Sequence, residues 1–103
     1  MRRILDGLRY DTETAEDLAT WSNGYEAGNW HHEEETLHRS PKGQLFIHGW
    51  GGPLSGYSES HGNNHSGSER LWLVDENEAF EWLIERELDV KAEELFPGRV
   101  REG

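Results

Sequence analysis

The sequence predicts an α+β domain, in which an antiparallel β-sheet of about five strands in hairpins packs with two main helices. Turn signals between short apolar runs predict the hairpins. Two other stretches repeat apolar residues three and four positions apart, as one face of a helix does. A chain of 103 residues has room for one modest core, so residues 1–103 are expected to form a single domain.

The N-terminal residues predict a hairpin followed by a helix. Arg2–Leu5 and Leu8–Tyr10 flank Asp6-Gly7, a pair that suits a type I′ turn because both of its residues need a positive φ. A short helix over about 12–20 would follow. Its apolar side would be Ala15, Leu18 and Ala19, and its acidic side would be Glu13, Glu16 and Asp17.

A second hairpin is predicted in the middle of the chain. Strands over Glu34–Arg39 and Gln44–Trp50 would join through Ser40–Gly43, where the proline suits a turn. Pairing Arg39 with Gln44 would place Leu37 opposite Phe46. Both faces of this hairpin would carry apolar residues, so we expect it to lie centrally in the sheet.

A long loop, a strand and a second helix are predicted for the remainder. Residues 51–69 are rich in Gly, Ser, Asn and His and lack periodicity, and a loop of this length is usually functional or mobile. Residues 70–74 resume as a strand. Asp75 would cap a helix, with Glu78 completing an acidic capping box. Residues 90–96 would add a final helical turn. The expected apolar stripe of the helix is Ala79, Phe80, Leu83 and Ile84.

The composition is that of a folded but very acidic protein. Mean hydropathy is −0.94 and hydrophobic residues make up 33% of the chain, which is near the limit for folding. Five tryptophans, three tyrosines and three phenylalanines are far more than a disordered acidic tail carries. The formal net charge of −11 argues against direct binding to nucleic acid or anionic membrane, because phosphates reward lysine and arginine. A basic partner is expected instead.

The acidic residues are concentrated in two blocks, which supply the candidate partner-binding residues. Residues 11–35 hold eight acids and no lysine or arginine, and residues 75–95 hold nine acids against two basic residues. Residues 1–10 carry three arginines and a single aspartate. In the first block the candidates are Glu13, Glu16 and Asp17. In the second they lie within an arc of roughly 100° on the predicted helix and are Glu78, Glu81, Trp82, Glu85 and Asp89.

Three interpretations of the acidic blocks are open at the level of sequence. They could form a solvated face that maintains solubility. They could reflect adaptation to high salt. The excess of arginine over lysine, eight against two, fits this interpretation, and the excess of glutamate over aspartate, sixteen against five, weakens it slightly. They could also mimic nucleic acid, because carboxylates on successive helical turns lie about 5–6 Å apart, comparable to phosphates along a strand. Trp82 would then be a binding anchor, or it would cover the edge of the core.

No enzyme, cofactor or metal site is predicted. The absence of cysteine excludes disulfides, thiolate zinc sites and cysteine nucleophiles. His61 and His65 are four residues apart but lie in the glycine-rich loop, and His31-His32 would point to opposite faces of a strand. Gly49–Pro53 has neither a helix nor a lysine behind it to meet phosphates. The histidines are therefore interpreted as solvated loop residues.

Several runs resemble a family of small, mostly uncharacterised bacterial and phage proteins. The resemblance extends along nearly the whole chain, and the matching runs are Leu8–Ala15, Trp21–Tyr25, Glu34–Arg39, Gly49–Tyr57 and Glu78–Leu83. The sequence departs from the family pattern at His38, where the pattern has tyrosine, and in the histidine-rich residues 61–65. The resemblance implies association with phages or plasmids.

Small acidic proteins of mobile elements resemble anti-CRISPR and anti-restriction inhibitors, several of which mimic DNA. We therefore expect a monomeric inhibitor of a bacterial defence complex, such as a CRISPR surveillance complex, that blocks target DNA binding. The alternative is an acidic binding module for a basic partner protein of the same element. No signal-peptide apolar region and no run of about eighteen apolar residues is present, so the bacterial cytoplasm is the expected location.

Overall fold

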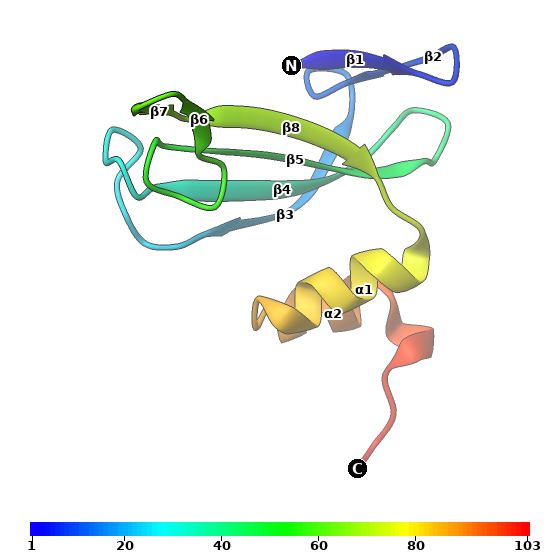
Figure 1. Ribbon diagram of the computed structural model, residues 1–103. Coiled ribbons are helices and arrows are strands. Elements are labelled where there is room, and N and C mark those ends of the chain that lie inside the picture. Colours follow the sequence, from blue (N-terminus) through cyan, green and yellow to red (C-terminus); the bar gives the residue numbers. More distant parts are fainter.

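The computed structural model describes all residues from Met1 to Gly103 and has the α+β architecture that the sequence predicts (Figure 1). The strands number eight rather than about five, because β3 and the short β6 and β7 form where a helix and a loop were expected. The elements are β1 (Arg2–Leu5), β2 (Leu8–Asp11), β3 (Glu16–Ser22), β4 (Glu33–Arg39), β5 (Leu45–Gly51), β6 (Glu59–His61), β7 (Asn64–Ser66), β8 (Ser68–Leu73), α1 (Glu76–Glu85), α2 (Asp89–Leu95) and a 3₁₀ turn at Pro97–Arg99.

A four-stranded antiparallel sheet in the order β3-β4-β5-β8 forms the centre of the protein. Figure 1 shows α1 and α2 on one side of this sheet and the β1–β2 hairpin on the other. We call these two sides the helix face and the hairpin face. The sheet thus lies between two unlike layers, as its buried residues also show. On the helix face Leu37, Ile47 and Leu83 are almost completely buried, and on the hairpin face Tyr10 and Phe46 pack together.

The two predicted hairpins are confirmed, and the first has the predicted turn. Asp6 and Gly7 both have positive φ, of 53° and 76°, as a type I′ turn requires. The strands of the second hairpin, β4 and β5, lie in the middle of the sheet as expected.

The predicted register of the second hairpin is wrong by one residue. Arg39 pairs with Leu45, so Leu37 lies opposite Ile47 and not opposite Phe46. The cause is Gly43, whose φ of +94° adds one residue to the turn before the ladder begins. The Ser40 N–H donates to the Gln44 carbonyl, so these two residues still pair. The loop between them is Pro41–Gly43, a three-residue hairpin loop that ends in a left-handed glycine.

The helix predicted over residues 12–20 is wrong, because residues 16–22 form the edge strand β3. A bulge interrupts the pairing of β3 with β4 between Asp17 and Ala19. The bulge turns two consecutive residues, Leu18 and Ala19, into the same core on the helix face. A bulged strand therefore imitates the helical spacing of apolar residues from which the helix was predicted.

The helix α1 begins as predicted and buries the predicted stripe except for Ile84, whereas Trp82 is buried in addition. Asp75 accepts a hydrogen bond from the Glu78 amide at 2.7 Å, and Glu78 accepts one from the Asp75 amide at 3.1 Å, so the capping box is complete. Ala79 and Leu83 face the sheet, as expected. Ile84 is instead 44% exposed, and Trp82 takes its place in the core.

Candidate functional site

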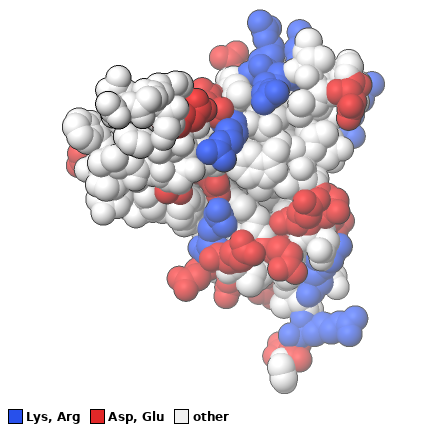
Figure 2. Space-filling view, viewed as in Figure 1, with Lys and Arg blue, Asp and Glu red and all other residues white.

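The acids predicted to form one row on the C-terminal helix are all exposed: Glu78, Glu81, Glu85 and Asp89. They lie on two helices, because α1 ends at Glu85 and Asp89 begins α2 beyond Glu87, whose φ is 58°. Figure 2 shows carboxylates gathered over the region of α1 and α2, whereas the part of the surface formed by the β6–β7 end carries few charges. Within the row, the Glu85 carboxylate lies 3.7 Å from the Arg86 guanidinium and the Glu78 carboxylate caps the helix. Glu81 and Asp89 make no ion pair, so most of this charge is not neutralised within the protein.

The second predicted row does not exist as a row. Glu16 and Asp17 are neighbours on β3, so their side chains point to opposite faces of the sheet. The Glu16 carboxylate lies 3.2 Å from the Arg39 guanidinium, and the Asp17 carboxylate lies 2.9 Å from Nδ1 of His38. Glu13 lies outside the strand, in the turn before it. These three acids were predicted to share one side of a helix, and two of them instead contact side chains of β4, of which only Arg39 carries a fixed positive charge.

Trp82 covers the core and does not project toward a partner. Only 6% of its surface is exposed, and its indole Nε1 donates a 2.8 Å hydrogen bond to Glu35. Of the two roles open to Trp82 in the sequence, the structure supports the covering of the core. A binding surface on α1 therefore consists of carboxylates without a tryptophan anchor.

The residue to which Trp82 donates, Glu35, is the centre of a buried polar cluster on the helix face. The Glu35 carboxylate accepts hydrogen bonds from the Tyr57 hydroxyl at 2.5 Å and from Arg86 Nε at 2.7 Å, in addition to the Trp82 indole. The Arg86 guanidinium lies between two indole rings, 4.9 Å from the Trp21 centroid and 5.3 Å from that of Trp82. The Glu35 carboxylate therefore has one counter-charge, Arg86, and further donors in Tyr57 and Trp82.

Tyr57 is the phenol of this cluster, and it acts as a hydrogen-bond donor to Glu35. Burial raises the pKa of Tyr57, and its hydrogen bond to Glu35 raises it further. The phenol therefore stays protonated and donates to the carboxylate. The carboxylate accepts from three donors, one of which is the Arg86 guanidinium, so its hydrogen bonds are made within the protein.

A close approach of the chain to the sheet at Gly49 allows Tyr57 to reach Glu35. A Cβ atom at Gly49 would overlap the Tyr57 hydroxyl oxygen. The segment that carries Tyr57 is held by backbone bonds, including Gly52 N–H to the His32 carbonyl and Leu54 N–H to the Trp30 carbonyl, both at 2.9 Å. The predicted loop over residues 51–69 is thus anchored in its first part, and its later part forms the exposed hairpin β6–β7.

Sequence reasoning missed the Glu35 cluster because its members are far apart in the chain. One local signal was available. Trp82 on α1 and Arg86, which caps the C-terminus of this helix, are four residues apart and so lie on one side of it. Glu35 lies in a strand that was expected to carry apolar residues on both faces, and a buried carboxylate there requires a cation from elsewhere.

A pair of histidines on the hairpin face forms a second polar cluster. His38 stacks on Phe46 with ring centroids 5.0 Å apart, and the His48 ring lies 6.4 Å from that of His38. The Nε2 atom of His48 lies 2.7 Å from the Glu69 carboxylate. Burial lowers the pKa of His38, and the Asp17 carboxylate opposes this shift without cancelling it. No group of three or more histidine, aspartate or glutamate side chains is placed to hold a metal ion.

Comparisons with protein-family models, with curated proteins and with solved structures find no match. No helix of the protein is both long enough and apolar enough to span a membrane.

Proposed function

We propose that the protein binds a basic, nucleic-acid-binding partner through the exposed carboxylates of α1 and α2 and thereby excludes nucleic acid from it. In its specific form, suggested by the resemblance described above, the protein is a phage or mobile-element inhibitor of a CRISPR surveillance complex. It would act as a monomer in the cytoplasm of the bacterial host. The surface is defined by Glu78, Glu81, Glu85 and Asp89, and we call it the acidic surface.

The observation that carries this proposal is that the acidic surface is exposed and mostly not neutralised. Residues 75–95 hold nine acids, of which only three lie within ion-pair distance of an arginine or lysine: Glu76, Glu85 and Glu94. Like charges along one helix repel each other and reduce its stability. A partner that presents arginines and lysines would relieve that repulsion through charge-assisted hydrogen bonds.

The test is DNA binding by a purified, guide-loaded CRISPR surveillance complex in the presence of the protein. The variant is Glu81→Lys/Glu85→Lys, because Glu78 caps α1 and its substitution would also affect folding. Wild-type protein should block DNA binding. The double reversal should weaken inhibition by about 2–5 kcal/mol if the charge pairs are buried in the interface.

A matched control distinguishes a local contact from net charge alone. Glu26→Lys/Glu59→Lys changes the net charge by the same amount at exposed positions outside the helices. Inhibition should survive this change. Equal loss in both double variants, or full inhibition by Glu81→Lys/Glu85→Lys, would contradict the proposal. Capture of a basic protein of the same element without loss of its DNA binding would instead support a binding module.

A further inference from the structure

A narrow cleft of about 270 Å³ lies between α1 and the edge strand β8, on the helix face of the sheet. Its sheet wall comes from Ile47, Trp72 and Val74, and its other wall comes from α1. Small-molecule sites usually occupy about 300–1,000 Å³, so this cleft suits one long side chain better than a whole small ligand. We call it the β8–α1 slot.

The helix wall of the β8–α1 slot is negatively charged. Three carboxylates of the acidic surface line it: Glu78, Glu81 and Glu85. By the helical period they lie within an arc of roughly 60° on α1, so they share one side of that helix. Glu85 lies 3.7 Å from the Arg86 guanidinium, whereas Glu78 and Glu81 belong to no ion pair. The slot therefore has a wall whose charge the protein leaves mostly unpaired.

The sheet wall of the slot presents an indole without a cation. Trp72 is half-buried and packs against the core of the helix face. The arginines that lie over aromatic rings of the protein do so at Tyr57, Trp21 and Trp82, and not at Trp72. An indole and unpaired carboxylates that line one narrow cleft are the environment in which a planar cation binds well.

The protein itself shows which cation fits such an environment. The Arg86 guanidinium lies 4.9 Å from the Trp21 centroid and 5.3 Å from that of Trp82, and its Nε donates to Glu35 at 2.7 Å. A guanidinium can stack on a ring and at the same time direct N–H donors from its edge to carboxylates. A lysine ammonium is a compact, strongly hydrated charge and lacks this planar shape.

We propose that the β8–α1 slot receives an arginine side chain of a partner protein, whose guanidinium stacks on Trp72 and donates hydrogen bonds to Glu81 and its neighbours Glu78 and Glu85. This assignment rests on the function proposed above and deepens it, because it names arginine as the anchor of the basic partner. It also adds a partner-binding residue on the sheet to those on the helices. A protein with a net charge of −11 attracts any basic peptide, so selectivity for arginine over lysine is the property that distinguishes the slot.

Peptide titrations followed by NMR of the backbone and indole N–H groups test the slot directly. The probes are a short glycine peptide with two arginines and the same peptide with lysine, or with uncharged citrulline, in place of arginine. The arginine peptide should produce saturable shifts at the Trp72 indole N–H and at the Glu81 amide. The lysine peptide should bind several-fold more weakly, and the citrulline peptide should not saturate.

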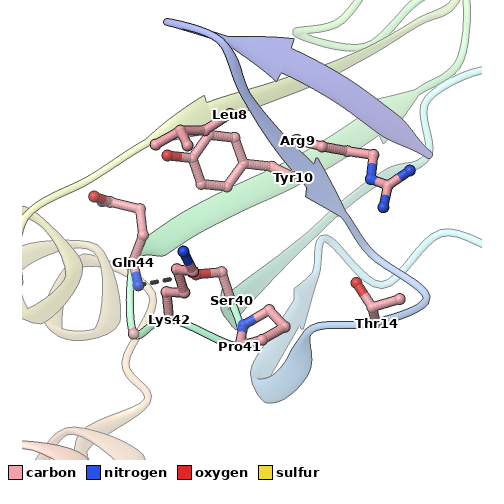
Figure 3. A pocket seen from close by; sticks show the side chains of 9 residues that line it. Leu8, Arg9, Tyr10, Thr14, Ser40, Pro41, Lys42 and Gln44 are labelled. Atoms are coloured by element: carbon pink, nitrogen blue, oxygen red, sulfur yellow. Dashed lines mark hydrogen bonds between the residues drawn. The ribbon is translucent and has the colours of Figure 1, made fainter.

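The larger cleft between β2 and the β4–β5 turn supplies an internal control (Figure 3). No acid lines that cleft, and Figure 3 shows Arg9 and Tyr10 on opposite sides of β2. The amides of residues 40–44, in its other wall, should therefore not shift with the arginine peptide.

Two substitutions with matched controls assign the binding to the slot. Trp72→Leu keeps apolar bulk and should weaken binding of the arginine peptide about fivefold, because it removes the ring on which the guanidinium stacks. Trp30→Leu removes an indole that is 66% exposed and lies outside the slot, and should change the affinity less than about twofold. Glu81→Gln should weaken binding several-fold, and Glu26→Gln, at an exposed position outside the helices, should not. Because Glu81 is exposed, Glu81→Gln keeps the fold even if Trp72→Leu does not.

The proposal is overturned if the lysine peptide binds as tightly as the arginine peptide, or if the Trp72 indole N–H does not shift saturably. It is also overturned if either control variant weakens binding as much as its partner in the slot. These outcomes are independent of any defence complex, so they are distinguishable from failure of the proposed function. Inhibition of DNA binding that Trp72→Leu leaves unchanged would refute the slot and retain the acidic surface, whereas selective arginine binding without inhibition would support the slot and refute the inhibitor.

Discussion

Replacement of Arg86 by methionine should destabilise the protein strongly, because it removes the one cation of the buried Glu35 cluster. The guanidinium donates to the Glu35 carboxylate at 2.7 Å and stacks between two indole rings. Methionine keeps much of the apolar bulk between the rings but supplies neither charge nor donor. The Glu35 carboxylate would then be a buried charge without a counter-charge.

The magnitude follows from the burial of the two side chains. Glu35 is 8% exposed and Arg86 is 22% exposed, and the loss of one partner of a buried pair costs about 3–5 kcal/mol. We expect the lower end, about 3 kcal/mol, because Tyr57 and Trp82 still donate to the carboxylate and Arg86 reaches solvent. For a domain of this size, that loss lowers Tm by about 12–24 °C.

The assay is urea unfolding followed by tryptophan fluorescence, with a double-mutant cycle. Glu35→Gln keeps an acceptor for Tyr57 and Trp82 and removes the charge. The variant Glu35→Gln/Arg86→Met should therefore lose less stability than the sum of the single variants, by at least about 1 kcal/mol. Arg99→Met is the control, because its pair with Glu76 is exposed and should contribute less than about 1 kcal/mol.

Two results would refute this reasoning. One is a cost below about 1 kcal/mol for Arg86→Met, which would mean that the pair behaves like an exposed one. The other is additivity of the two single variants within about 0.5 kcal/mol, which would mean that Glu35 does not depend on Arg86.

Two further predictions concern Gly49 and His38. Gly49→Ala should destabilise the protein by about 1–3 kcal/mol in the same unfolding assay, because the added methyl group would overlap Tyr57. Gly28→Ala is the control: a Cβ atom there has no neighbouring atom within 4 Å, so this change should cost less than about 0.5 kcal/mol. Because burial lowers the pKa of His38 below 6.5, the unfolded chain takes up a proton before the folded protein does as the pH falls. As the pH is lowered from about 7.5 to about 5.5, the free energy of unfolding should therefore decrease more in the wild type than in His38→Gln. Equal decreases in the two proteins would contradict the lowered pKa of His38.

The features that the sequence predicted correctly depend on a few adjacent residues. The turn at Asp6-Gly7 needs only two residues that tolerate positive φ, and the cap at Asp75 needs only Glu78 three positions later. These interactions form within one turn, so their chemistry is readable without knowledge of the rest of the chain.

The errors arose where a distant strand decides the local structure. Residues 16–22 pair with β4, and the bulge at Leu18 is stabilised by the core that both Leu18 and Ala19 enter. Periodicity cannot distinguish this bulge from a helix, because each places neighbouring apolar residues on one side. The loss of the helix also separates Glu13, Glu16 and Asp17, since their predicted alignment depended on it.

The contacts that hold the Glu35 cluster together do not involve the Glu81 carboxylate of the acidic surface. Trp21 stacks on Arg86, Gly49 admits Tyr57, and Tyr57 donates to Glu35. These contacts explain why a chain with this fold requires those residues, whatever it binds. The cluster therefore accounts for stability, whereas Glu81 makes no ion pair and its charge serves no contact within the protein. For this reason, reversal of charge on α1 tests the inhibitor proposal, while substitution within the Glu35 cluster tests only the fold.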